Sequence, residues 1–410
     1  MNLYIFNETS RAAVYGVGTY IRELTSALKD SDVNICVVHL NSEKTDNEQA
    51  IVEGIRYWYM TAPIRWNALF DWHKYYRNVV YLLRLQIKNT DNLVFHVNNN
   101  LSGKLAEELK KTFVCKIISS IHCLDWCFSL LGNVTRFRKI LAMQETGQHD
   151  ELKKPINESY QKEKGFFDLA DKIICLSEHT QQILQDDYKM KPDKITVIYN
   201  GLTDRLPIAD RQELRRKYDM PDIPLILFAG RLDDSKGLMY AIQAFKKTVK
   251  TKLRCHFIIT GSGTYDVYLK ACEDIWRHVT WTGLIRREKL FDLYSIADIG
   301  VMPSFHEQCS YVAIEMMMHG LPIIGSTTTG LKEMIIDGET GLHIPVIEQN
   351  DSVEIDTDLL AEKILYLLQN PLERERMGAN ARRRYETVYS AEIFRKNMTA
   401  FYQSLFYKPC

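Results

Sequence analysis

The 410-residue sequence contains no apolar run that approaches 18 residues, so no stretch of it is expected to span a membrane. It has no net charge, because 52 Lys and Arg balance 52 Asp and Glu, and a strongly cationic nucleic-acid binder is therefore not expected. It has no Cys-x-x-Cys pair, and its nine cysteines are scattered, which favours buried, reduced thiols over a zinc site. It opens without the pattern of a secretory signal. We expect a cytoplasmic protein of two or three domains.

Short apolar runs alternate with helical patterns along the chain, which is typical of α/β proteins with parallel sheets. We expect twelve strands in two sets of six, divided near residues 200–207. The expected strands are Leu3–Phe6, Asn34–Leu40, Leu93–Val97, Cys115–Ile121, Lys172–Leu176 and Lys194–Tyr199, then Pro224–Ala229, Cys255–Thr260, His278–Trp281, Ile299–Met302, Pro322–Gly325 and Gly341–Ile344. Two doubly wound domains facing a cleft are the simplest arrangement, and ligands are expected at the carboxyl ends of the strands.

The strongest chemical signal is the segment from Gly230 to Gly237, which follows one of these strands and precedes a helix. It puts Arg231 and Lys236 beside a helix N-terminus. A planar guanidinium, an ammonium and free backbone N–H groups together favour a diphosphate-binding loop. The alternative is a solvated turn with incidental charge.

Two carboxylates eight residues apart, Glu307 and Glu315, form the second signal. We expect Glu307 on the loop after the strand Ile299–Met302, pointing into the cleft. Glu315 is expected in a helix that starts near Ser310 and is apolar almost all round. A surface acid is the alternative for Glu315, but the apolar surroundings favour an acid that binds ribose or sugar hydroxyls.

Glycines at the ends of two further strands predict close backbone approach to a ligand. Gly330 precedes a short helix, where free backbone N–H groups could hold a phosphate oxygen. Gly261 and Gly263 follow the strand Cys255–Thr260, where a simple turn is an equally good interpretation.

In the first half, Gly16 and Gly18 open a helix and form another candidate phosphate loop. A dinucleotide fingerprint would have its third glycine where Ile21 stands, and its ribose-binding acid near Asn41. A nicotinamide-dependent oxidoreductase is therefore disfavoured.

His122 follows the strand Cys115–Ile121, again at a carboxyl end. A histidine there could orient or deprotonate an acceptor hydroxyl, and a structural histidine is the equally weighted alternative.

The segment Trp58–Lys88 interleaves eight aromatic residues with basic ones. It could be an amphipathic surface for a membrane, a sugar or a peptide, but we favour a helix packed on the N-terminal core.

Together these motifs resemble the retaining GT-B glycosyltransferases of family 4, the glycosyl transferase group 1 superfamily. The resemblance rests on Gly230-Arg231, Lys236-Gly237, Gly261-x-Gly263, Thr282-Gly283, Ala297-Asp298, Pro303-Ser304, Glu307 to Glu315, Gly320-x-Pro322, Gly330-Leu-x-Glu333, Gly338-x-x-Gly341-Leu342, Ser177-Glu178 and Asn200-Gly201. Three positions depart from the family pattern: Tyr15 precedes the first glycine loop, Cys123 follows His122, and Cys309-Ser310 replaces Phe-Gly. The Ser310 hydroxyl could donate to sugar or phosphate.

The resemblance implies a fold of two Rossmann-like domains, with residues 1–203 binding the acceptor and 204–390 binding a nucleotide sugar. Residues 391–410 would form a helix that packs back on the N-terminal domain. Arg231 and Lys236 would hold the diphosphate, Glu307 the donor sugar and Glu315 the ribose, while the segment 282–285, which includes Leu284, would cradle the base. No metal or cofactor is implied.

The implied reaction is transfer of a hexose or N-acetylhexosamine, with retention, from a nucleotide-diphospho-sugar, UDP being the expected nucleotide. The acceptor would be a glycan, a lipid-linked molecule or a peptide; the Glu-Gln-Cys-Ser variant is similar to a bacterial subgroup associated with radical-SAM peptide maturation. A catalytically inactive nucleotide-sugar-binding or scaffold protein of the same fold is the alternative.

Overall fold

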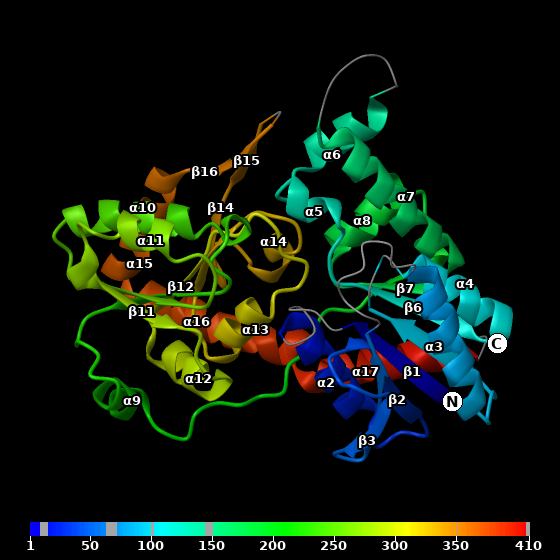
Figure 1. The fold of residues 1–410 in the computed structure, drawn as a ribbon. Coiled ribbons are helices and arrows are strands. Elements are labelled where there is room, and N and C mark those ends of the chain that lie inside the picture. The colour runs from blue at the N-terminus through cyan, green and yellow to red at the C-terminus, as the bar shows by residue number, and fades with distance from the viewer. Residues whose placement is uncertain are drawn as a thin grey trace. The chain divides into compact units, whose positions relative to one another are not determined.

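The computed structural model describes residues 1–8, 15–62, 72–98, 100, 102–143, 151–349 and 351–406. The chain divides into two compact units (Figure 1). Unit 1 comprises residues 1–126, 138–201 and 391–410, and unit 2 comprises residues 127–137 and 202–390.

The segment 127–137 belongs to unit 2, although the sequence predicts one N-terminal domain over residues 1–203. Its side chains explain the difference. Asn133 donates from Nδ2 to the carbonyl of Gln349 at 2.9 Å, and Thr135 donates from Oγ1 to Glu348 Oε2 at 2.7 Å.

The sheet of unit 1 has the order β3-β4-β2-β1-β5-β6-β7-β8 and is parallel except for β3, which pairs antiparallel with β4. Its strands are β1 (Asn2–Glu8), β2 (Asn34–Ser42), β3 (Glu48–Val52), β4 (Ile55–Thr61), β5 (Leu93–Val97), β6 (Lys116–Ile121), β7 (Lys172–Cys175) and β8 (Ile195–Val197). The β3–β4 hairpin adds two strands to the six expected. Its turn contains Glu53 and Gly54, both with positive φ, as a tight two-residue hairpin turn requires.

The expectation of one helix across Trp58–Lys88 is wrong at its start, because Trp58 lies within β4, where it is buried. Residues 63–71 lie outside the described residues. From Trp72 to Gln86 the segment is helix α3, which buries Tyr75, Tyr76, Val79, Val80 and Leu83. The interpretation of a helix packed on the core therefore holds for this part.

The other helices of unit 1 are α2 (Gly16–Leu28), α4 (Gly103–Thr112), α7 (Lys153–Leu169), α8 (Glu178–Asp186), the 3-10 turn η1 (Pro192–Lys194) and α17 (Ala391–Ser404). The short helices α5 (Trp126–Ser129) and α6 (Val134–Ala142) span the boundaries of the segment 127–137. Helix α17 lies beside α2 (Figure 1). Tyr402 of α17 reaches into the sheet, where its hydroxyl is 2.5 Å from Nδ1 of buried His96.

The main sheet of unit 2 is fully parallel, with the order β11-β10-β9-β12-β13-β14. Its strands are β9 (Leu225–Ala229), β10 (His256–Thr260), β11 (Val279–Gly283), β12 (Ile299–Met302), β13 (Ile323–Ser326) and β14 (Gly341–Ile344). A separate antiparallel pair consists of β15 (Val346–Glu348) and β16 (Val353–Ile355). The strand order is that of a Rossmann sheet, and it reverses between β9 and β12. Ligands of such sheets bind at the carboxyl ends of these two strands.

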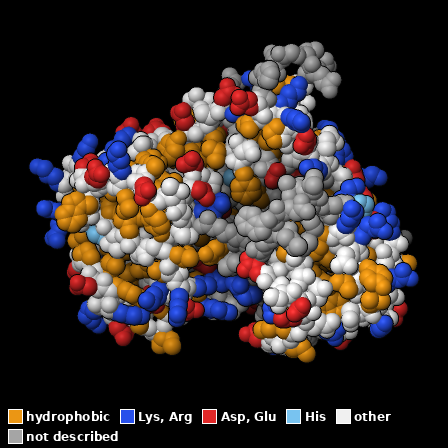
Figure 2. All heavy atoms as spheres, in the orientation of Figure 1, with side chains coloured by type: hydrophobic (Ala, Val, Ile, Leu, Met, Phe, Trp, Pro, Cys, Tyr) orange, Lys and Arg blue, Asp and Glu red, His pale blue; other side chains and the backbone are white. Residues whose placement is uncertain are grey.

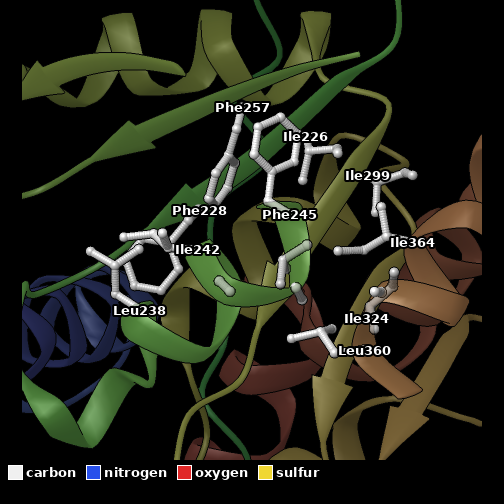
Figure 3. Packing of buried hydrophobic residues seen from close by; sticks show 14 of the residues in the cluster. Ile226, Phe228, Leu238, Ile242, Phe245, Phe257, Ile299, Ile324, Leu360 and Ile364 are labelled. Carbon is white, nitrogen blue, oxygen red and sulfur yellow. The ribbon is translucent and has the colours of Figure 1, made fainter. Parts of the chain in front are cut away.

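Helices cover both faces of this sheet. They are α9 (Arg211–Lys217), η2 (Asp234–Lys236), α10 (Leu238–Lys250), α11 (Asp266–Ala271), η3 (Trp276–His278), α12 (Arg287–Ile296), α13 (Tyr311–Met318), α14 (Leu331–Met334), α15 (Thr357–Gln369), α16 (Pro371–Arg384) and a π-helical turn over Tyr385–Tyr389. On one face, Phe245 of α10 and Ile364 of α15 pack with Ile226, Phe257 and Ile299 of the strands (Figure 3). On the other, a Cβ at Gly300 would lie 2.5 Å from Met316 Sδ, so α13 packs directly on β12.

Two arginines of α16, Arg382 and Arg384, bind main-chain carbonyls of neighbouring elements. Arg384 donates to the carbonyls of Met334 and Glu333 at 2.7 and 2.6 Å, and Arg382 donates to that of Met318 at 2.7 Å. This helix thereby fixes the ends of α13 and α14 relative to the sheet.

No helix within the described residues is long and apolar enough to cross a bilayer. On the face shown in Figure 2, Lys, Arg, Asp and Glu side chains are all spread over the surface, in keeping with the zero net charge.

Gly237 occupies a position in unit 2 where a Cβ does not fit. Its φ is 65°, and a Cβ there would lie 1.9 Å from the carbonyl oxygen of Pro303. We expect Gly237→Ala to destabilise the protein by more than about 1 kcal/mol, because alanine is strained at this φ and the backbone must also move. Gly165→Ala is the control: it is exposed in α7 with nothing within 4 Å, and should stabilise the helix by about 0.5–1 kcal/mol. Calorimetric unfolding of both variants tests this, and equal midpoints would contradict it.

Candidate functional site

Three loops of unit 2 follow adjacent strands at the carboxyl edge of the sheet, after β9, β12 and β13. The first is joined to the second because the Phe305 N–H donates to the Ser235 carbonyl at 2.8 Å. Gly237, which precedes α10, lets the two backbones approach at Pro303. The loops that carry the predicted phosphate and sugar ligands therefore meet at the switch point of the sheet.

Lys236 and Glu307 form an ion pair across these two loops. Nζ of Lys236 lies 2.6 Å from Oε1 of Glu307, and their side chains are only 18% and 12% exposed. Ser304 donates from Oγ to the same Oε1 at 3.1 Å. A partly buried pair is screened weakly by water, so each charge is held in place by the other.

The third loop holds the backbone of Glu307. The Glu307 N–H donates to Thr329 Oγ1 at 3.0 Å, and the Glu307 carbonyl accepts from Thr329 Oγ1 and, at 2.8 Å, from the N–H of Gly330. The N–H of Gly330 itself is thus engaged with Glu307. The binding of a phosphate oxygen at the N-terminus of this short helix stays a prediction.

Arg231 is the second cation of the first loop. Its Nη2 donates to Ser235 Oγ at 3.2 Å, and its Nη1 lies 3.3 Å from Asp233 Oδ2. The side chain is 38% exposed, and its guanidinium lies 5.9 Å from the ring centroid of Phe128. It is thus oriented within the loop but accessible to an anion.

Glu315 is buried in α13, where each carboxylate oxygen has one protein partner. Arg287 donates from Nη2 to Oε1 at 2.8 Å, and Tyr294 donates from its hydroxyl to Oε2 at 3.0 Å. Burial raises the pKa of Glu315, while Arg287 and the two hydrogen bonds lower it in part. The carboxylate has further lone pairs, so it can still accept hydrogen bonds from a pair of hydroxyls.

The remaining predicted donor residues of unit 2 have definite structural surroundings. A Cβ at Gly261 would lie 1.7 Å from the Gly230 carbonyl oxygen, and one at Gly263 would lie 2.2 Å from that of Leu232. These glycines therefore bring the loop after β10 against the loop after β9. Leu284, after β11, is 58% exposed. Ser310 is buried at the N-cap of α13, and its N–H lies 3.2 Å from Met334 Sδ.

His122 lies in unit 1, directly after β6. Its Nε2 is 2.9 Å from Asn98 Oδ1, and Asn98 donates from Nδ2 to the carbonyl of Phe6 at 3.0 Å. This second bond fixes the amide orientation, so His122 must carry its proton on Nε2. Burial lowers the pKa of His122 to about 4. The imidazole is therefore neutral at neutral pH, and its Nδ1 is a hydrogen-bond acceptor.

Gly16 and Gly18 form the first turn of α2, with Gly16 exposed and Gly18 buried. The residues 9–14 that precede this turn lie outside the described part of the chain. Behind it, the ring of Tyr20 meets that of His122 edge to face at 4.7 Å between centroids. The structure thus brings Tyr20 of this helix to His122 within unit 1.

Sequence reasoning missed Arg287 and Tyr294, the partners of Glu315. They are seven residues apart in α12, which is two helical turns and hence one face. A buried acid in an apolar helix requires such partners, so a search for a cation and a hydroxyl at this spacing could have found them.

We expect Arg287→Ala to leave Glu315 buried without a counter-charge and to cost about 3–5 kcal/mol. The loss should be larger at pH 8 than at pH 5. Glu315 has a raised pKa in the folded protein, so its neutral form is the one that folding favours, and protonation at low pH relieves the unpaired charge. Urea unfolding at both pH values measures the effect. Arg287→Ala combined with Glu315→Gln is the control that should recover most of the loss at pH 8; an equal loss at both pH values would argue against a charge effect.

Comparison with known proteins gives the family of the chain. A family model described as Glycosyltransferase Family 4 matches residues 14–205, and one described as Glycosyl transferases group 1 matches residues 210–384. The alpha-D-kanosaminyltransferase of Streptomyces kanamyceticus is 25% identical over 243 residues, which are 58% of this chain and 61% of that protein. The chain thus spans less than two thirds of this relative's length.

Solved structures show the same fold. Sucrose-phosphate synthase from Thermosynechococcus elongatus matches with a TM-score of 0.79 at 22% identity, over 99% of both chains. Anabaena HepE, solved in complex with UDP-glucose, matches with a TM-score of 0.68 at 13% identity, over 98% of this chain and 100% of that chain. The eight- and six-stranded parallel sheets are those of the GT-B fold. The chain belongs to the family 4 glycosyltransferases, the glycosyl transferases group 1.

Proposed function

We propose that the protein transfers a hexose or N-acetylhexosamine, with retention, from a UDP-sugar to an acceptor hydroxyl. The observation that carries this proposal is the Lys236–Glu307 pair, which joins a cation and a carboxylate at the switch point of the unit 2 sheet. A nucleotide-diphospho-sugar carries an anionic diphosphate next to a sugar, so a cation beside a hydrogen-bond-accepting carboxylate suits both parts. The UDP-glucose complex of HepE, a protein of the same fold, supports the choice of donor.

In this proposal the diphosphate lies against Arg231 and Lys236. Both cations stabilise the negative charge that develops on the departing phosphate. Lys236 then changes partners in part, from Glu307 to the diphosphate, which frees Glu307 Oε1 to accept a hydrogen bond from the donor sugar. The Glu315 carboxylate accepts from the ribose hydroxyls while Arg287 and Tyr294 keep it in place.

Retention follows from where the acceptor proton can go. The carboxylate of Glu307 stabilises an oxocarbenium-like centre electrostatically and forms no covalent bond. The leaving phosphate oxygen takes the proton of the acceptor hydroxyl and guides the attack on its own face of the sugar. The charge stabilisation needs no metal in this scheme.

The acceptor is a glycan, a lipid-linked molecule or a peptide that unit 1 binds beside His122. The neutral imidazole, with its proton on Nε2, can accept a hydrogen bond at Nδ1 and so orient a hydroxyl. Its low pKa makes it a poor proton carrier at neutral pH. We therefore assign His122 to orientation of the acceptor and not to net proton removal.

We expect Arg231→Ala and Lys236→Ala each to slow UDP-glucose turnover by roughly 100-fold, because each removes one charge stabiliser. Lys246→Ala is the control. It removes an ion pair with Asp274 that lies outside the three loops of the site, and it should not change the rate.

Release of UDP separates an enzyme from an inactive nucleotide-sugar-binding protein, which would bind the donor and release none. The anomeric coupling of the product by NMR tests retention: an α-donor should give an α-product, and a β-product would reject the mechanism.

We also propose that the outer face of α3 contacts anionic lipid headgroups. Tyr81 and Leu85 are 59% and 49% exposed, Arg84 and Lys88 are exposed beside them, and the helix contains no Asp or Glu. Exposed apolar groups flanked by cations fit the surface of an anionic bilayer.

Sedimentation with vesicles tests this contact. The protein should bind phosphatidylglycerol–phosphatidylcholine vesicles at low salt and not vesicles of phosphatidylcholine alone. Arg84→Glu combined with Lys88→Glu should abolish binding, whereas Lys250→Glu with Lys252→Glu, the same change of charge in unit 2, should weaken it little. Equal loss in both double variants would show a non-specific charge effect.

A further inference from the structure

Glu163 of unit 1 is a fully buried acid that the proposed reaction does not use. It lies in α7, and its side chain is inaccessible to solvent. Its Oε2 accepts from the Tyr188 hydroxyl at 2.5 Å, and its Oε1 accepts from the Asp125 N–H at 2.9 Å and from Asn100 Nδ2 at 3.2 Å. Burying a carboxyl group costs free energy that its hydrogen bonds must offset. The three donors therefore point to a role in holding part of the backbone in place.

What Glu163 holds is the loop directly after His122. The Asp125 N–H is bound by Glu163 itself, and the Cys123 carbonyl accepts from the Asn100 side chain that Glu163 also binds. The loop is thus fixed at two backbone points, one and three residues after His122. A change in these bonds would therefore shift the backbone next to His122.

We propose that Glu163 is a positioning residue whose protonation state sets the loop that carries His122, and through it the orientation of the acceptor. The inference rests on the proposed function for its effect on rate. The anchoring of the loop by Glu163 stands on the contacts alone.

The titratable groups that face Glu163 are the Asp125 carboxylate on the loop and the Tyr188 hydroxyl after α8. Asp125 accepts at Oδ2 from Ser159 of α7, and the ring of Tyr188 packs against that of Tyr160. None of the described contacts of Glu163 is with a cation. Burial therefore raises its pKa to about 7, with the nearby charge of Asp125 adding to the rise and the three hydrogen bonds opposing it.

The raised pKa of Glu163 determines how stability changes with pH. Folding favours the neutral form of Glu163, so the stability that this form contributes is lost as pH rises from about 4.5 through about 7. The ionised form, however, accepts stronger hydrogen bonds from the Asp125 N–H and Asn100. The loop is held more firmly above pH 7 than below it.

The test compares wild type with Glu163→Gln, whose amide oxygen can still accept from Asp125 but cannot titrate. In wild type, kcat/KM for UDP release from UDP-glucose should rise several-fold with an inflection near pH 7, and this inflection should be absent from Glu163→Gln. Asp171→Asn is the matched control. Asp171 accepts from the Ile117 N–H at 2.7 Å near the opposite end of β6, so its loss should leave the inflection in place.

A second readout does not need activity. The ¹H–¹⁵N resonance of the Asp125 amide should shift with a midpoint near pH 7 in wild type and in Asp171→Asn, but not in Glu163→Gln. Persistence of the shift or of the rate inflection in Glu163→Gln would overturn the proposal, as would an amide shift in wild type with no change in rate. If no variant releases UDP, the proposed function fails, and the amide titration alone decides whether Glu163 sets the loop.

Discussion

The approach of two backbones at Gly237 and Pro303 is the constraint on which the candidate site depends. Only a residue without a Cβ fits there, since a Cβ would lie 1.9 Å from the Pro303 carbonyl oxygen. Because the loops after β9 and β12 meet at this point, Lys236 is brought within 2.6 Å of Glu307. The loop after β13 then closes on the other side of Glu307 through Thr329 and Gly330. One steric requirement thus brings two of the loops together, and hydrogen bonds from the third loop hold the backbone of Glu307.

Glu307, Glu315 and Glu163 are largely removed from water, and their surroundings differ. Glu307 is paired with Lys236, and in the proposed reaction it exchanges this partner for the donor sugar. Glu315 has Arg287 and Tyr294 below it and keeps lone pairs for hydroxyls. Glu163 has hydrogen-bond donors but no described cation, and burial raises its pKa to about 7. The partners of a buried acid, more than its depth, decide what it can do.

The sequence predicted well what depends on neighbours along the chain. The strands of unit 2 and the loops at Gly230–Gly237 and Glu307–Glu315 were found because apolar runs and strand-end residues are local signals. Strand β3 was missed because Glu48–Val52 is mostly exposed and has no buried face to give a pattern. Strand β4 was missed because its Trp58 was assigned to the aromatic segment Trp58–Lys88. The hydrogen bond from the Gly330 N–H to the Glu307 carbonyl was not predicted, since its two partners belong to different loops. Contacts such as Arg287–Glu315 depend on how elements pack, which spacing alone does not determine.

Arg382 and Arg384 of α16 have a consequence for how this unit can vary. They bind main-chain carbonyls, at Met318, Glu333 and Met334, and not the side chains of those residues. Every amino acid supplies the same main-chain carbonyl, so a substitution at these positions keeps the hydrogen-bond acceptor. Arg382 also pairs with the carboxylates of Asp204 and Glu386, so its side-chain partners are constrained together with it. The two carbonyls that Arg384 binds place no such demand on the side chains of Glu333 and Met334, so in an alignment Arg384 is expected to stay fixed while those two residues vary.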